Sequence, residues 1–304
     1  MHLFITGGTG LIGSALINML LKQGHHQITI LTRNKAKAEK NWGNRISYCT
    51  SLGLIDTLSG YDGVINLAGE PIIGKPWSLD QKERLCNSRW NITKRLTELI
   101  KISETPPQVF ISGSAVGYYG KQKDNIVDEK STPHNEFTHQ LCKTWEELAL
   151  EAQSEKTRVC ISRTGIVLAK EGGMLSMLTL PFRLGLGCSL SNGSQYISWI
   201  HIQDMLNAIM FLLNTPEAQG CFNLTAPNPV TNKRFSKILS ATLYRPCLFR
   251  MPAFAIKLLL GESSTMVLDG QRVIPKRLLD LHFRFMYEHL DDALNSLLKG
   301  KKKY

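Results

Sequence analysis

A glycine-rich turn near the start of the chain restricts the possible folds more than any other feature. The apolar run His2–Thr6 is followed by glycines at positions 7, 10 and 13, and apolar residues then recur at helical spacing up to Gly24. In a strand–turn–helix unit the early glycines let backbone N–H groups approach a pyrophosphate, and the third lets the helix pack closely on the strand. The pattern predicts a dinucleotide site here. Its expected contact residues are Gly7, Thr9, Gly10, Leu11, Ile12 and Gly13.

The end of the second predicted strand, residues 28–31, indicates which dinucleotide binds. NAD-binding versions of this unit place an Asp or Glu there, about 20 residues beyond the glycines, on the ribose 2′-hydroxyl. This chain has Thr32 and Arg33 instead. Because an arginine attracts the 2′-phosphate of NADP, we predict NADP(H) rather than NAD(H) as cofactor, bound through these two residues. The alternative is that Arg33 is a solvated cation at the strand end.

Strands and helices alternate over the first two thirds of the chain, which predicts a parallel sheet covered on both faces. Further strands are expected at 64–67, 109–112, 159–162 and 199–202, and helices at 80–103, 135–152 and 204–213. The fold class is therefore α/β, a doubly wound parallel Rossmann sheet with a smaller, mostly helical C-terminal substrate lobe. We assign 1–171 and 200–226 to the sheet domain, 172–199 and 227–298 to the lobe, and 299–304 to a basic tail. Within the lobe, 181–194 is expected to be irregular.

The charge of the chain favours small anionic partners. The 304 residues carry a formal net charge of +11, and four lysines lie in the last six residues. No basic run is interleaved with aromatics, so nucleic acid is not expected, and no apolar stretch is long enough for a membrane span. Seven isolated cysteines predict neither a metal site nor disulfides and favour a reducing cytoplasm. We expect a small anionic or nucleotide-linked substrate, and a monomer or homodimer.

Several further motifs resemble those of the extended short-chain dehydrogenase/reductase superfamily, which includes nucleotide-sugar epimerases. Beside the glycine turn, the matching segments are 66–69, 91–93, 112–114, 163–165 and 199–204. More narrowly, the chain resembles the YfcH-like epimerase family, whose members are often labelled nucleoside-diphosphate-sugar epimerases or SulA-like proteins. The narrower resemblance rests on segments 66–71, 117–120, 181–187 and 271–278 and covers residues 1–298.

The resemblance implies further cofactor-binding residues. Leu67, Ala68 and Gly69 would run along the cofactor after the strand at 64–67. Glu83 and Arg89, on the long helix, match positions that face the cofactor in family members. The alternative for these two is an ordinary charged helix face. The family name implies epimerisation, although the substrates of its members are largely undefined.

The resemblance also implies a catalytic site, with one departure from the superfamily pattern. In active members a Tyr transfers the proton, a Lys four residues later holds the nicotinamide ribose, and a Ser bonds the substrate oxygen. Ser114 matches the Ser and Lys143 the Lys, but His139 stands where the Tyr is expected. Tyr118 and Tyr119 are alternative proton donors.

Helical spacing leaves the role of His139 open. The apolar residues of its helix form one stripe, which consists of Phe137, Leu141, Trp145, Leu148 and Ala152. This stripe places His139, Lys143 and Glu146 on the opposite side, which is either the cleft or solvent. We favour a surface histidine over a proton donor.

Three polar residues near later strand ends have mainly structural interpretations. Arg163 binds either a substrate anion or a structural partner, and His201 and Asp204 are typical of a strand-to-helix turn. Two functions therefore remain. One is an oxidoreductase or epimerase acting by hydride transfer at a carbonyl or hydroxyl carbon. The other is an NADP-binding regulatory or redox-sensing protein that has lost turnover.

Overall fold

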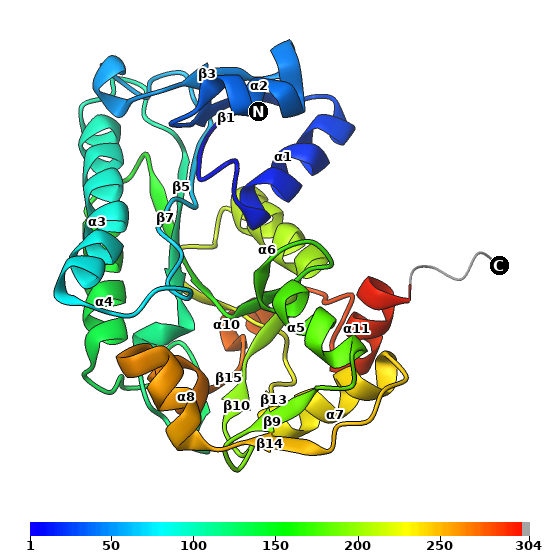
Figure 1. The fold of residues 1–304 in the computed structure, drawn as a ribbon. Helices are drawn as coiled ribbons and strands as arrows, with labels where there is room; N and C mark the ends of the chain where they lie inside the picture. The colour runs from blue at the N-terminus through cyan, green and yellow to red at the C-terminus, as the bar shows by residue number, and fades with distance from the viewer. Residues whose placement is uncertain (300–304) are drawn as a thin grey trace.

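The computed structural model describes residues 1–299 and contains the expected doubly wound sheet (Figure 1). Seven strands pair in parallel throughout. In spatial order they are β12 (Gly220–Leu224), β7 (Arg158–Thr164), β5 (Val109–Ala115), β4 (Gly63–Asn66), β1 (His2–Thr6), β2 (Gln27–Leu31) and β3 (Ser47–Cys49). The chain order reverses between β1 and β4. Doubly wound sheets bind ligands in a crevice at the carboxyl edge beside such a reversal, and this edge between β1 and β4 is called the crevice below. The α/β prediction is confirmed.

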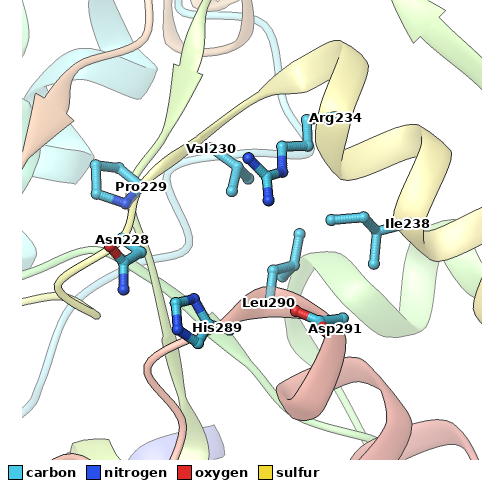
Figure 2. Close-up of a pocket in the computed structure, with 8 residues that line it drawn as sticks. All are labelled: Asn228, Pro229, Val230, Arg234, Ile238, His289, Leu290 and Asp291. Atoms are coloured by element: carbon cyan, nitrogen blue, oxygen red, sulfur yellow. The ribbon is translucent and has the colours of Figure 1, made fainter.

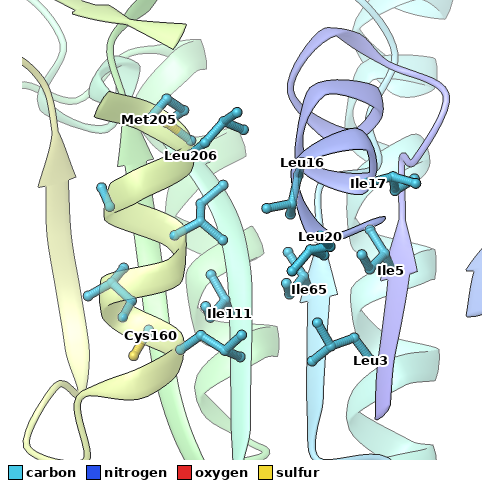
Figure 3. Close-up of a cluster of buried hydrophobic side chains, with 14 of the residues drawn as sticks. Leu3, Ile5, Leu16, Ile17, Leu20, Ile65, Ile111, Cys160, Met205 and Leu206 are labelled. Carbon is cyan, nitrogen blue, oxygen red and sulfur yellow. The ribbon is translucent and has the colours of Figure 1, made fainter. Parts of the chain in front are cut away.

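Helices cover both faces of the sheet (Figure 1). One face carries α1 (Leu11–Gln23), α2 (Lys35–Trp42) and α6 (Ile202–Asn214), and the other carries α3 (Leu79–Lys101) and α4 (Phe137–Leu150). Side chains alternate along β1, so Leu3 and Ile5 pack in one cluster with α1 and α6 (Figure 3). Phe4 points to the other face and packs in the cluster that includes α3. Burial of each such side chain contributes about 1.5–3 kcal/mol.

Local signals fix the ends of the helices that flank the crevice. The Ser78 hydroxyl accepts a hydrogen bond from the Gln81 N–H (3.2 Å) and caps α3. Helix α1 ends at Gly24, whose φ of 77° is the left-handed conformation that glycine adopts without strain. The expected helices at 80–103 and 135–152 correspond to α3 and α4.

The C-terminal region combines short helices with two-stranded ribbons around its own core. The ribbons are β6 (Ile126–Val127) with β15 (Arg272–Val273), β8 (Ile166–Leu168) with β11 (Trp199–His201), β10 (Tyr196–Ile197) with β13 (Val230–Thr231), and β9 (Cys188–Leu190) with β14 (Phe249–Met251). The helices are α5 (Gly173–Arg183), α7 (Asn232–Thr242), α8 (Ala253–Leu260), α9 (Thr265–Leu268), α10 (Lys276–Asp280) and α11 (Leu290–Leu298).

The expectation of irregular structure over 181–194 is wrong in part: 184–187 and 191–194 are turns and loop, but the other residues are regular. Helix α5 continues through Pro181 to Arg183, and β9 follows it. The physical reason is that Leu175 and Phe182, two helical turns apart, are both buried in the C-terminal core and hold the segment in place. The proposed domain boundaries remain a proposal.

Two observations complete the description of residues 1–299. None of the helices in this range is long and apolar enough to cross a membrane. The same range holds no group of three or more His, Cys, Asp or Glu side chains suited to a metal ion. Residues 300–304 of the expected basic tail lie outside the described residues.

Candidate functional site

The glycine turn between β1 and α1 leaves no room for side chains. Gly7 has a φ of 69°, and a Cβ there would lie 2.4 Å from the carbonyl oxygen of Leu67. A Cβ on Gly13 would lie 2.3 Å from the Gly7 carbonyl oxygen, which instead accepts a hydrogen bond from the Gly10 N–H (2.9 Å). Thr9 and Gly10 are exposed at the edge of the crevice. The turn therefore presents bare backbone to any ligand in the crevice.

The first turn of α1 provides the positive end of a helix dipole at the same place. No side chain among residues 1–299 caps this helix, and its first turn carries no acidic residue. The free N–H groups of a helix N-terminus bind phosphate well. The predicted contact residues Leu11 and Ile12 lie in this first turn and are half-buried. The turn and the helix together fit a pyrophosphate.

The segment after β4 lies beside the glycine turn. The Leu67 N–H donates to the Thr6 carbonyl oxygen (3.2 Å), which joins the ends of β4 and β1. Gly69 is exposed and packs against the guanidinium of Arg89, which is 9% exposed. That guanidinium donates to the carbonyl oxygens of Glu70 and Leu85 (2.8 Å each). Arg89 thus holds this loop in place from α3.

The other predicted cofactor residues lie outside the glycine turn and the segment after β4. Thr32 is buried and its hydroxyl donates to the Asn34 carbonyl oxygen (3.4 Å). Arg33 is exposed at the end of β2 and makes no ion pair within the described range. Glu83 is exposed on α3 and accepts a hydrogen bond from Asn87 (3.4 Å). Arg33 is free to meet a 2′-phosphate, whereas Glu83 faces solvent.

Ser114 belongs to a buried ionic network at the end of β5. Its hydroxyl donates to Oε1 of Glu146 on α4 (2.6 Å), and Arg163 of β7 donates to the same carboxylate through Nε (2.9 Å) and Nη2 (2.7 Å). The charged side chains are only 4% and 5% exposed. Burial lowers the pKa of Arg163, but hydrogen bonding and charge pairing with Glu146 raise it overall. Of the two interpretations left open for Arg163, the ion pair is the one formed.

The two tyrosines that follow Ser114 differ in the hydrogen bonding of their hydroxyl groups. Tyr119 is buried, donates to Oδ1 of Asn223 (2.6 Å) and accepts from Nη1 of Arg163 (3.0 Å). Burial raises its pKa. Tyr118 is half-buried, and the Arg163 guanidinium lies 3.5 Å from its ring centroid. Its hydroxyl makes no hydrogen bond within the described part of the chain, so it is the available proton donor of the two.

The buried face of helix α4 is wider than the stripe predicted for it, because Thr138, His139, Cys142 and Glu146 are buried together with Leu141 and Trp145. His139 is 8% exposed and its Nδ1 bonds the Tyr118 carbonyl oxygen (2.7 Å), so the expectation of a surface histidine is wrong. Lys143 has a 57% exposed side chain that pairs with Glu147 (3.6 Å). The structure therefore brings His139 to Tyr118 and Glu146 to Ser114, but it does not bring Lys143 to either.

Cys142, the residue before Lys143, lies beside Ser114. It is 3% exposed, and burial raises the pKa of its thiol to about 12. Thr138, Cys142 and Glu146 follow one another at four-residue spacing and are all buried. This spacing, with Arg163 ending a neighbouring strand, is the signal that would have identified Glu146 as a buried partner.

The predicted structural role of His201 and Asp204 is confirmed. His201 caps α6 by accepting the Gln203 N–H at Nδ1 (3.0 Å). The Asp204 carboxylate accepts the N–H groups of Met286 (2.8 Å) and Tyr287 (2.9 Å). Both side chains therefore fix the C-terminal region to α6.

The environment of His201 predicts an acid-dependent loss of stability. Burial lowers the pKa of His201 to about 4 from an ordinary value of 6.5. Between these values the unfolded chain binds a proton that the folded chain does not, so stability falls as pH falls. We expect this residue to lower the free energy of unfolding by about 2 kcal/mol between pH 7 and 5. Urea denaturation at pH 7, 6 and 5 measures it.

The matched variant for this test is His201→Asn, because asparagine keeps the helix cap but does not titrate. It should flatten the pH dependence, whereas His282→Asn at an exposed position should leave it unchanged. Equal pH dependence in the wild type and His201→Asn would contradict the assignment.

A small cavity of about 200 Å³ lies near the start of α11 (Figure 2). Its lining residues come from the segments around β13, α7 and α11, and are Asn228, Pro229, Val230, Arg234, Ile238, His289, Leu290 and Asp291. None of them belongs to the glycine turn or to the Ser114 network. The cavity is therefore separate from the crevice between β1 and β4.

Comparisons with known proteins agree with this geometry. The profile of the NAD dependent epimerase/dehydratase family matches residues 3–224, and that of a domain of unknown function (DUF1731) matches residues 251–297. An Arabidopsis thaliana protein, described as a chloroplastic homolog of the epimerase family protein SDR39U1, is 38% identical over 305 residues. The match covers 98% of this chain and 87% of the relative.

Two solved structures are similar over nearly the whole chain. The human epimerase family protein SDR39U1 (isoform 2), crystallised with NADPH, has a TM-score of 0.91 and 30% identity over 99% of this chain and 100% of that one. A Corynebacterium glutamicum nucleoside-diphosphate sugar epimerase has a TM-score of 0.78 and 31% identity, covering 98% of this chain and 58% of that one.

Proposed function

The chain belongs to the NAD dependent epimerase/dehydratase family, and on this basis we propose that it binds NADP(H) in the crevice between β1 and β4. The observation that carries the proposal is the bare backbone cradle, in which Cβ atoms on Gly7 and Gly13 would meet backbone atoms at 2.4 and 2.3 Å. The NADPH in the human relative supports the phosphorylated cofactor.

Different residues would bind different parts of the dinucleotide. The free backbone N–H groups within the segment from Thr9 to Gly13 would hold the pyrophosphate, and Arg33, with the neighbouring Thr32, would hold the 2′-phosphate. Leu67, Ala68 and Gly69 would line the path toward Ser114. When bound, the nicotinamide supplies or accepts a hydride.

The proton relay of hydride-transfer relatives is not assembled around Ser114. Its hydroxyl proton is donated to Glu146 at 2.6 Å, and therefore is not free for a substrate carbonyl. Lys143 points to solvent, and the residue beside Ser114 is Cys142. We therefore propose an NADP(H)-binding regulatory or redox-sensing protein with little turnover of carbonyl substrates.

A second candidate function is an NADP(H)-dependent oxidoreductase or nucleoside-diphosphate-sugar epimerase acting on an anionic, nucleotide-linked substrate. One observation favours it: the Tyr118 hydroxyl has no partner among residues 1–299 and is the one tyrosine of the pair free to donate a proton. Hydride transfer at a carbonyl or hydroxyl carbon would then use Tyr118 as general acid and base.

Oxidation of NADPH against nucleotide sugars, aldehydes and quinones separates the two candidates. Tight NADPH binding without oxidation supports the first. Oxidation that is lost in Tyr118→Phe supports the second and overturns the first. His139→Gln is assayed in the same way, because His139 is the other candidate proton donor. Its Nδ1 bonds the backbone carbonyl oxygen of Tyr118.

The cofactor preference gives a separate prediction for Arg33. We expect Arg33→Ala to weaken NADPH binding roughly tenfold or more and to leave NADH binding unchanged, because only NADPH carries the phosphate that forms a charge-assisted hydrogen bond. Fluorescence titration with both cofactors measures the ratio. Arg84→Ala, at an exposed position of α3, is the matched control. An unchanged preference for NADPH in Arg33→Ala would contradict the assignment.

A further inference from the structure

A larger cavity of about 580 Å³ lies between α7 and the edge of the β9–β14 ribbon. These elements lie together at the lower end of the view in Figure 1. The volume falls within the range of small-molecule sites, roughly 300–1,000 Å³. None of the lining residues belongs to the glycine turn or to the Ser114 network. The cavity therefore needs an explanation of its own.

The lining of this cavity carries four cations and no carboxylate. The cations are Lys233 and Lys237 of α7, Arg245 of the following loop and Arg250 of β14. None of the four forms an ion pair with an acidic residue in the part of the chain that the structure describes. Like charges around one cavity repel each other, so an anion bound there would be stabilised by all four.

The two arginines are already held in position. Nε of Arg245 donates to the Arg183 carbonyl oxygen (2.8 Å), and Nε of Arg250 donates to the Ser191 carbonyl oxygen. Arg245 also donates through Nη1 to the Tyr244 carbonyl oxygen (3.4 Å), which leaves its Nη2, and both terminal nitrogens of Arg250, as donors. A planar guanidinium matches two oxygens of one phosphate group, and prior ordering lowers the entropic cost of binding.

Ser240 gives independent evidence for a ligand. Its side chain is 3% exposed and lines the cavity, but its hydroxyl has no hydrogen-bond partner within residues 1–299. Buried hydroxyl groups in folded proteins are nearly always paired. Ser240 lies on the same side of α7 as Lys233 and Lys237, so a ligand held by the lysines would reach it. A phosphate oxygen would accept its proton.

We propose that this cavity binds a small phosphorylated anion. Several negative oxygens in one group satisfy the four cations and the Ser240 hydroxyl together. The hollow shape and the buried position of Ser240 fit a small molecule that enters the cavity rather than a flat polyanionic surface. Leu248 and Phe249 add an apolar wall for an organic part of the ligand. This proposal does not depend on NADP(H) binding.

Binding of inorganic pyrophosphate by isothermal titration calorimetry tests the proposal on the full chain. Lys237→Gln/Arg250→Gln is expected to weaken pyrophosphate binding at least about tenfold, because charge-assisted hydrogen bonds are lost. Ser240→Ala, which removes an unpaired hydroxyl, is expected to keep the melting temperature and weaken binding severalfold. The matched control is Lys22→Gln/Lys156→Gln, which removes the same charge at exposed positions outside the cavity.

Four results would overturn the proposal. Binding of phosphatidic acid vesicles without binding of pyrophosphate would assign the cations to a lipid surface. The wild type could fail to bind pyrophosphate at all. An equal loss in the control variant would show a general charge effect. Binding that NADPH displaces and that the cavity variants retain would place pyrophosphate at the glycine turn.

Discussion

Replacing Arg163 by methionine is expected to lower the free energy of unfolding by about 3–5 kcal/mol. Arg163 donates two hydrogen bonds to Glu146, and both side chains are about 95% buried. Without the guanidinium the Glu146 carboxylate would remain in the interior with only two uncharged partners, the Ser114 hydroxyl and the Cys221 thiol. Urea denaturation of the wild type and Arg163→Met at pH 7 measures the difference.

Two further variants show whether the loss comes from an unpaired charge. Arg163→Met/Glu146→Leu should recover most of the lost stability, since an apolar pair of similar volume carries no buried charge. Lys143→Met removes one partner of an exposed pair on the same helix, and should change stability by about 1 kcal/mol or less. A small effect of Arg163→Met, equal to that of Lys143→Met, would contradict the buried network.

Replacing Gly13 by alanine is expected to weaken NADPH binding at least about 100-fold, because it would displace the backbone N–H groups that form several charge-assisted hydrogen bonds. The added Cβ would lie 2.3 Å from the Gly7 carbonyl oxygen and 2.8 Å from the Gly8 Cα, so backbone must move. Overpacking of this kind also costs about 1–3 kcal/mol of stability. Fluorescence titration with NADPH and thermal unfolding measure the two effects.

Gly10→Ala separates loss of binding from loss of structure. A Cβ on Gly10 would meet only the Gly7 carbonyl oxygen, at 3.2 Å, and otherwise enter the open crevice. This variant should fold normally and still bind NADPH more weakly. Gly53→Ala is the matched control, since its nearest neighbour would be the Ser51 hydroxyl at 3.5 Å. Normal NADPH binding by both Gly13→Ala and Gly10→Ala would exclude the turn as the cofactor site.

The sheet could be predicted because its strands and helices have strong local sequence signals, and because their alternation along the chain is typical of a parallel sheet. The glycine turn, the apolar runs of β1, β4, β5 and β7 and the periodic helix α3 together specify a doubly wound parallel sheet. The elements that the sequence did not indicate have weak local signals. Helix α2 buries only Ala38 and Trp42, and β12 includes the polar Asn223, which is buried because it pairs with Tyr119.

The Ser114 site could be predicted only in part, because a buried charge is identified by its partner and not by its position. Hydrophobic spacing placed Glu146 opposite the apolar stripe of α4, in either the cleft or solvent, and gave no sign that it is buried. Its burial depends on Arg163, which is 17 residues away in the chain and lies on a different element. The wider buried face also includes Cys142 and His139, whereas Lys143 is exposed, which is one of the two positions that the spacing allowed.

A crystal structure of the chain with NADPH bound tests the central proposal most directly. The central proposal is that this family member binds NADP(H) in the β1–β4 crevice without a Ser–Tyr–Lys relay. We expect the pyrophosphate on the N–H groups of residues 9–13, the 2′-phosphate on Arg33, and the Ser114 hydroxyl still donating to Glu146. Lys143 should remain in solvent. A lysine amino group on the nicotinamide ribose, with Ser114 released toward nicotinamide C4, would contradict the account.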